Sequence, residues 1–181
     1  SHAAGLSVEQ LIARGTDQVP VPVSTAVRSL TARRVAREPM AYILGAREFW
    51  GLPFKVSPAV LVPRPDSETV IEAALALLRD RSHPWRILDL GVGSGCLLLT
   101  LLREYPGATG VGMDASPAAL AIAEENARSL GVASRANLVV GDWREPCWAE
   151  RLGGPFDLIV SNPPYIEAAT IEGLMPEVAD H

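Results

Sequence analysis

The residues best suited to chemistry are Asn162-Pro163-Pro164-Tyr165, which directly follow an apolar run at 156–160. Such a run predicts a buried parallel strand, and open α/β folds bind ligands at the carboxyl ends of these strands. The tetrapeptide would place an amide, a carbonyl and an aromatic ring at that edge. This combination suits a planar nitrogen substrate, because a weakly nucleophilic nitrogen must be held through its own N–H groups and kept flat against a ring.

Each residue of the tetrapeptide has a predicted role. The side-chain oxygen of Asn162 and the carbonyl of Pro163 are candidate acceptors, and Tyr165 supplies the ring. The prolines at 163 and 164 fix φ and remove two backbone donors, which disfavours recruitment of this stretch into a helix or ladder. The alternative interpretation is a strand-terminating turn, for which Asn-Pro is an ordinary signal. Motifs earlier in the chain favour the binding interpretation.

A glycine-rich turn, Gly91-Val92-Gly93-Ser94-Gly95, follows the first strand of the predicted core. Alternate glycines let the backbone approach a ligand closely, and the helix N-terminus that follows favours an anionic group such as a carboxylate. A dinucleotide fingerprint would need a third glycine at the next position, which is a cysteine. The alternative is simply a tight strand-to-helix turn.

Two further acidic positions end predicted strands. Asp114 closes the second core strand, where a carboxylate can accept hydrogen bonds from both hydroxyls of a ribose. Asp142-Trp143 follows the third, offering an acceptor for an exocyclic amine and an indole for stacking on a purine. The alternatives are a helix N-cap for Asp114 and a loop-packing aromatic for Trp143.

The elements that must position these residues follow from hydrophobic periodicity. The core pattern alternates strands and helices, which predicts a parallel sheet with right-handed crossovers. The expected strands are 86–90, 109–113, 137–140 and 156–161, and the expected helices are 96–105 and 117–130.

The segment before the core predicts smaller elements. Residues 7–37 indicate two short helices, and 42–62 a β-hairpin. A helix follows, with Asp66 or Ser67 as its N-cap. The predicted domains are a helical cap at 1–40, a hairpin linker at 41–65 and a ligand-binding domain at 66–181.

Composition narrows the functional classes. A hydrophobic content of 48% and a charged content of 20% indicate a globular core. The net charge of −5 lacks the basic footprint of an autonomous nucleic-acid binder. The two cysteines have no C-x-x-C spacing, which predicts reduced thiols in a cytoplasmic protein. The three histidines are scattered, so we expect no metal site, and no apolar segment approaches the roughly 20 residues that span a bilayer.

Taken together, the four strand-end motifs resemble a class I S-adenosylmethionine-dependent methyltransferase that acts on a planar nitrogen. Further segments resemble the HemK/PrmC glutamine methyltransferases more narrowly: REPMAYILG at 37–45, EFWG at 48–51 and LVPRPDSE at 61–68. The resemblance implies an α/β fold with a Rossmann-like methyltransferase sheet. It also implies methylation of the side-chain amide nitrogen of the glutamine in the Gly-Gly-Gln loop of class 1 peptide-chain release factors.

The same resemblance implies roles for the motif residues. The loop at 91–95 would line the methionine end of S-adenosylmethionine, Asp114 would hold the ribose, and Asp142 with Trp143 would flank adenine. The tetrapeptide at 162–165 would bind the glutamine amide, with Asn162 also touching the cofactor. The Pro63-Arg64-Pro65 loop would lie near the active site, although Arg64 fits a surface position equally well.

The chain also departs from the family pattern. Val92 stands where a small hydroxyl residue is usual, and Ser67 where threonine is common. Family members carry a longer helical N-terminal domain and further strands after the tetrapeptide, so we expect a truncated form with C-terminal strands missing. Two alternatives therefore stay open: an amino-methyltransferase acting on a nucleic-acid base or a ribosomal-protein glutamine, and a non-catalytic fragment. The acidic charge weighs against a nucleic-acid substrate, because extruding a base requires extensive contacts.

Overall fold

The computed structural model of the chain describes residues 2–163. Pro164 and Tyr165, to which the sequence assigns substrate contacts, lie outside the described residues. Two compact units are present, one containing residues 2–44 and the other residues 45–163. The predicted domain boundaries after residues 40 and 65 stay predictions.

The N-terminal unit is helical. It contains the 3₁₀ turn η1 (His2–Ala4) and the helices α1 (Val8–Ala13), α2 (Val21–Val35) and α3 (Met40–Leu44). Ser7 begins α1 with a capping box, because its hydroxyl accepts from the Gln10 N–H at 3.2 Å while its own N–H donates to Gln10 Oε1 at 2.9 Å. The first residues of the hairpin expected over 42–62 are instead part of helix α3, because the carbonyl of Pro39 accepts the N–H groups of Tyr42 and Ile43 and so starts a helical turn there.

A β-hairpin opens the second unit, formed by β1 (Ala46–Phe49) and β2 (Leu52–Lys55). Its two-residue turn, Trp50-Gly51, has φ of 54° and 69°, the positive values that suit the twist of a tight hairpin. Phe49 and Phe54 are buried and meet edge to face, with ring centroids 6.2 Å apart. The hairpin therefore has its own apolar face, which belongs to the core of this unit.

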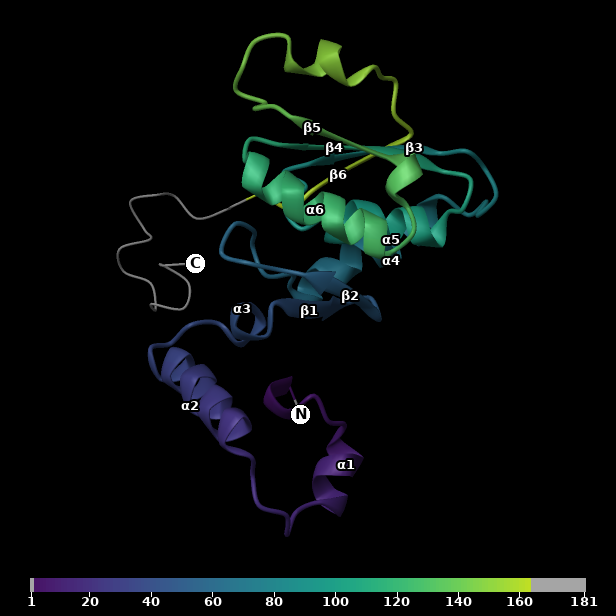
Figure 1. The fold of residues 1–181 in the computed structure, drawn as a ribbon. Helices are drawn as coiled ribbons and strands as arrows, with labels where there is room; N and C mark the ends of the chain where they lie inside the picture. Colours follow the sequence, from purple (N-terminus) through teal and green to yellow (C-terminus); the bar gives the residue numbers. More distant parts are fainter. Residues whose placement is uncertain (1, 164–181) are drawn as a thin grey trace. The chain divides into compact units, whose positions relative to one another are not determined.

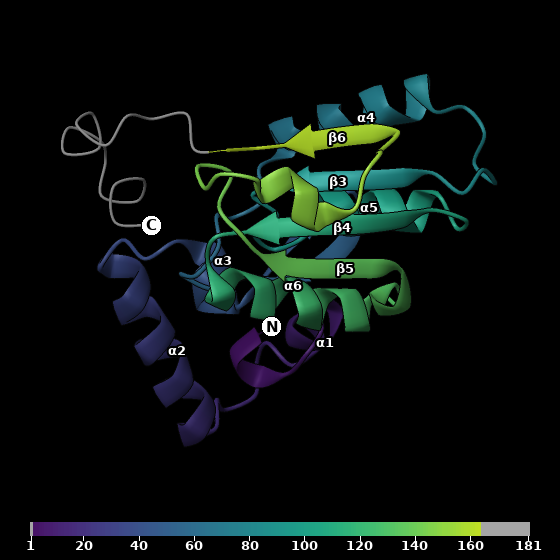
Figure 2. The same ribbon diagram turned by 90° about the horizontal axis from the view of Figure 1, so that it is seen from above.

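A four-stranded parallel sheet forms the centre of the second unit. Its strands are β3 (Arg86–Leu90), β4 (Thr109–Asp114), β5 (Ala136–Val140) and β6 (Leu158–Ser161), in the order β5-β4-β3-β6. Figure 2 shows all four arrows pointing the same way, so their carboxyl ends meet at one edge. This arrangement confirms the predicted α/β fold with a parallel sheet.

Three helices cover one face of the sheet: α4 (Glu68–Leu77), α5 (Cys96–Glu104) and α6 (Pro117–Ser129), as Figure 1 shows. The 3₁₀ turn η2 (Pro65–Ser67) leads directly into α4. Gly110 lets α5 pack closely, because a Cβ at this position would collide with Leu98. One hydrophobic cluster contains buried residues from these helices, from β3 and from the hairpin.

The opposite face of the sheet is covered by less structure. The 3₁₀ turns η3 (Ala133–Arg135) and η4 (Trp148–Leu152) flank β5, and the segment with η4 lies over this face (Figure 1). Leu152 packs there in a small cluster with Leu88, Val111 and Met113. No helix among residues 2–163 is both long enough and apolar enough to cross a membrane.

Candidate functional site

Two neighbouring cavities lie at the carboxyl edge of the sheet. The larger has a volume of about 450 Å³ and the smaller about 40 Å³, and both are lined by Leu61, Gly91 and Asn162. The larger is also lined by Asp114, Ala115, Gly141, Asp142, Trp143, Arg144 and Pro163. The smaller is also lined by Val62, Pro63, Asp89, Val92, Ser94, Cys96 and Leu97. The fold thus gathers most of the predicted site residues around two neighbouring cavities, although Gly93 and Gly95 line neither of them.

The glycine loop is tied to the strand beside it. The N–H groups of Gly91 and Val92 both donate to the Met113 carbonyl, at 2.8 and 3.0 Å. Gly91, Gly93 and Gly95 have φ of 75°, 53° and 82°, a region that residues with a Cβ rarely occupy. The loop therefore follows a path that needs glycine, and it leads directly into the N-terminus of α5.

Asp114 links this loop to the start of the next helix. Its Oδ2 accepts from the Gly93 N–H and its Oδ1 from the Ser116 N–H, both at 2.9 Å. The N-cap of α6 is Ser116, whose hydroxyl accepts from Ala119 N, so the cap alternative for Asp114 is wrong. Each carboxylate oxygen retains a second lone pair, so Asp114 can still accept hydrogen bonds from the hydroxyl groups of a ligand.

Asp142 and Trp143 follow β5 and line the larger cavity. The guanidinium of Arg144 donates to both carboxylate oxygens of Asp142 at 2.6–3.0 Å, which holds the pKa of that carboxyl below its usual range. The indole of Trp143 lies against Gly91, within 3.5 Å of where a Cβ there would sit, and the residue is 40% exposed. Trp143 therefore presents part of its surface to the cavity.

Asn162 borders both cavities, and its Nδ2 donates to Ser67 Oγ at 3.2 Å. Ser67 occupies the predicted N-cap position of α4, but its hydroxyl makes no capping bond. The reason is conformational: Ser67 has φ −70° and ψ −12°, because η2 already makes this residue helical, whereas a capping side chain needs extended backbone. Ser67 is thus the N-cap residue of α4 by position, as predicted, but it makes no side-chain capping bond.

The sequence that contains these motif residues matches a recognised domain family. Residues 87–181, just over half of the chain, match the family described as "Methyltransferase domain". The chain belongs to the methyltransferase domain family. Residues 1–45 additionally match the family described as "PrmC N-terminal domain".

Curated relatives narrow this resemblance. The chain is 48% identical over 178 residues to a release factor glutamine methyltransferase of Rhodospirillum rubrum, covering 98% of this chain and 53% of the relative. It is 49% identical over 181 residues to the protein of the same name in Bradyrhizobium diazoefficiens, covering 99% of this chain and 59% of that one. The resemblance to the HemK/PrmC methyltransferases is therefore confirmed. The chain spans about half the length of the curated relatives it matches.

A solved structure supports the methyltransferase fold. The N-terminal domain of human METTL16, solved in complex with SAH, superposes with a TM-score of 0.54 at 18% identity, covering 81% of this chain and 55% of that chain. At this level of identity the likeness concerns the fold alone. It agrees with the parallel sheet and with the helical layer described above.

The candidate site also contains residues that the sequence analysis did not identify. Asp89 is 1% exposed; its Oδ2 accepts from the Leu98 N–H at 3.3 Å, while its Oδ1 has no partner among residues 2–163. Burial raises the pKa of Asp89 to about 7, and burial likewise raises the pKa of the nearby Cys96 thiol to about 12. An acidic residue inside the apolar run of β3 was the available sequence signal for Asp89. Arg144 lacked such a signal, because pairing with Asp142 depends on the turn between them.

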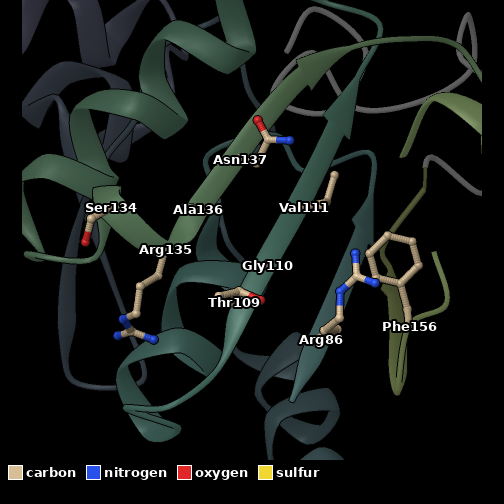
Figure 3. Close-up of a pocket in the computed structure, with 9 residues that line it drawn as sticks. All are labelled: Arg86, Thr109, Gly110, Val111, Ser134, Arg135, Ala136, Asn137 and Phe156. Atoms are coloured by element: carbon tan, nitrogen blue, oxygen red, sulfur yellow. The ribbon is translucent and has the colours of Figure 1, made fainter. Parts of the chain in front are cut away.

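A separate cavity of about 320 Å³ lies at the amino ends of β3, β4 and β5 (Figure 3). Its two arginines are engaged by the protein itself: Arg86 donates to the Gly153 carbonyl and lies beside the Phe156 ring, and Arg135 donates to three backbone carbonyls. These bonds stabilise the ends of neighbouring elements. The carboxyl edge, with its glycine loop and acidic side chains, is therefore the candidate site of the methyltransferase domain.

Proposed function

We propose that this chain is part of an enzyme that transfers a methyl group from S-adenosylmethionine to the side-chain amide nitrogen of a glutamine, the one in the Gly-Gly-Gln motif of peptide-chain release factors. The observation that carries the proposal is the place of Asn162, an amide acceptor shared by two cavities at the glycine-loop edge. The names of the relatives at 48% and 49% identity support the same substrate.

The residues at the carboxyl edge fit the proposed cofactor. Asp114 would accept the ribose hydroxyls, and Asp142 with Trp143 would flank the adenine. The backbone of the loop at 91–95 would approach the methionine part. The ammonium group of that part matches the buried Oδ1 of Asp89, which has no hydrogen-bond partner within residues 2–163. When bound, the cofactor supplies a methyl group already activated by its sulfonium centre.

The protein's own task is then mainly alignment. Asn162 Oδ1 and the Pro163 carbonyl would accept the two N–H groups of the substrate amide and orient its nitrogen. These acceptors bind more strongly as the nitrogen gains positive charge, so they stabilise the transition state more than the ground state. Among residues 2–163, no histidine lines either cavity, which agrees with a reaction that relies on positioning. Pro164 and Tyr165 are proposed to complete the substrate contacts.

The partner in this proposal is a class 1 release factor acting as a protein substrate, and the setting is the cytoplasm. The net charge of −5 disfavours stable binding to nucleic acid. We also propose that residues 1–40 form a cap, that 41–65 link it, and that 66–181 form the domain that binds the cofactor.

Methyl transfer from labelled S-adenosylmethionine tests the proposal directly. We expect label in a release factor and none in a release factor whose motif glutamine is replaced by alanine. Duplex DNA and ribosomal RNA serve as competing substrates in parallel reactions. Label in the nucleic acid but not in the release factor would overturn the proposed substrate. Calorimetry with S-adenosylhomocysteine tests cofactor binding separately, and an absence of binding heat would support a non-catalytic fragment.

A further inference from the structure

Ser67 makes an unusual use of its hydroxyl group. A serine at the first position of a helix ordinarily accepts a hydrogen bond from the helix backbone. Ser67 does not, and its Oγ instead accepts from Asn162 Nδ2, a residue 95 positions away in the chain. The hydroxyl therefore links the start of α4 to the end of β6 at the border of both cavities.

In this hydrogen bond the Nδ2 end of the Asn162 amide meets Ser67, which leaves the Oδ1 end available. The two ends of an asparagine side chain are nearly equal in shape but opposite in hydrogen-bonding character. With Nδ2 held by Ser67, Oδ1 is the remaining polar atom of the side chain, and no group among residues 2–163 donates to it. A reversed amide would present donors to the cavity and would repel the N–H groups of a substrate amide.

The turn that carries Ser67 is itself anchored. The Ser67 N–H donates to the Arg64 carbonyl at 3.0 Å, and the carboxylate of the adjacent Glu68 accepts from the Trp50 N–H at 2.9 Å. The indole N–H of Trp50 donates in turn to Glu104 of α5 at 2.9 Å. The hairpin turn, the start of α4 and the end of β6 thus form a continuous series of contacts that ends at Asn162.

We propose that Ser67 is a positioning residue that fixes the Asn162 amide with Oδ1 available to the cavity, so that the site selects substrates bearing N–H groups. The effect on catalysis rests on the methyl transfer proposed above. The orientation of the amide does not, because it is a property of the protein alone. Threonine, which has the same hydroxyl, can replace serine in this role.

Nuclear magnetic resonance of the Asn162 side-chain amide tests the orientation without any substrate. The signal is assigned by its disappearance in Asn162→Ala. We expect Ser67→Ala to shift this signal and accelerate its hydrogen exchange, and Ser67→Thr to retain the original behaviour. Thr69→Val is the matched control, because it removes a hydroxyl from the same turn that donates only to the Asp66 carbonyl. An Asn162 signal unchanged by Ser67→Ala would overturn the proposal.

Kinetics with a release factor test the catalytic consequence. Because one hydrogen bond is worth about 0.5–1.5 kcal/mol, we expect Ser67→Ala to lower kcat about 2- to 10-fold while KM and the Kd of S-adenosylhomocysteine change less than about twofold. Ser67→Thr should restore kcat. Ser67→Cys, with a weak acceptor of similar size, provides the same test if alanine prevents folding. A raised KM with unchanged kcat would contradict positioning for the transition state, whereas absence of methylation in the wild-type chain would contradict the proposed function instead.

Discussion

Asn162 is the residue on which the proposed chemistry depends most directly. Replacing it with alanine removes the acceptor for the substrate amide, so we expect turnover to be nearly abolished. Asp114, Asp142 and Trp143 stay in place, and the affinity for S-adenosylhomocysteine should therefore change only a few-fold. Calorimetry and methyl-transfer assays on the same preparation provide the comparison. A parallel collapse of cofactor affinity would show that Asn162 acts mainly in cofactor binding.

Asp89 gives the folded protein a distinctive dependence on pH. Its folded-state pKa of about 7 lies above the ordinary value of 3.8, so between these values the folded state holds a proton that the unfolded state releases. This contribution to stability is complete below the lower value and is lost as the pH rises through the upper one. We expect Asp89→Asn to remove this component, so that the variant gains stability relative to wild type as the pH rises from about 4 to about 7. Urea unfolding of both proteins at several pH values measures the free energy of unfolding. Parallel pH profiles of this free energy in wild type and variant would refute the prediction.

The sequence analysis identified residues by type and spacing, and this worked where the backbone pattern determines the position. Asp114 and Asp142 follow strands, so their place at the carboxyl edge could be predicted. Asp89, Arg144 and Ser67 could not be assigned in the same way, because their roles depend on burial or on partners brought near by the fold. The hydroxyl of Ser67 does not make the capping bond that its local sequence indicates, because it accepts a hydrogen bond from Asn162, 95 positions away.

At the scale of elements, Asn126 of α6 joins the hairpin to the glycine loop. Its Nδ2 donates to the carbonyls of Lys55 and Ser94 at 3.0 and 2.8 Å, and its Oδ1 accepts from the Lys55 N–H at 2.7 Å. The Asn126 side chain is 1% exposed, so water has little access to its surroundings. Removing the amide would leave the Lys55 N–H and the carbonyls of Lys55 and Ser94 without these hydrogen bonds.

We therefore expect Asn126→Ala to lower the free energy of unfolding by about 2–4 kcal/mol, given a cost of about 1–3 kcal/mol for each buried group left without a partner and partial relaxation. Glu125→Ala is the control one residue away. It removes an exposed ion pair with Lys55 and should change stability by less than about 1 kcal/mol. Chemical denaturation measures both, and equal effects from the two variants would contradict a special role for Asn126.

Most elements could be predicted because periodicity in the core is strong, but boundaries and short turns could not. The strand expected from residue 156 begins at Leu158, because Phe156 lies beside Arg86 instead of continuing the ladder. Helix α3 was missed, since its five residues contain a tyrosine and an isoleucine that also suit a strand. Short elements carry too few residues for their period to be decisive.

At the scale of the whole molecule, β5 and β6 are the outer strands of the described sheet. Ile159 of β6 and Val140 of β5 are each 60% exposed, and outer strands with apolar side chains favour pairing between molecules. We expect Ile159→Lys to reduce concentration-dependent association without a large loss of thermal stability. Sedimentation velocity over a range of concentrations measures this. Association unaffected by the lysine would indicate contacts elsewhere on the protein.

Trp143 gives the candidate site an intrinsic fluorescence signal. Its indole rests on Gly91 and faces the larger cavity while remaining 40% exposed, so its emission depends on contact with water. An adenine ring stacked on this indole would displace that water and quench the fluorescence. We expect titration with S-adenosylhomocysteine to reduce emission in the wild-type chain, and Trp143→Phe to abolish most of the change. The Trp143 indole, because it lies against the glycine loop, thus reports by its fluorescence whether a ligand is bound beside that loop.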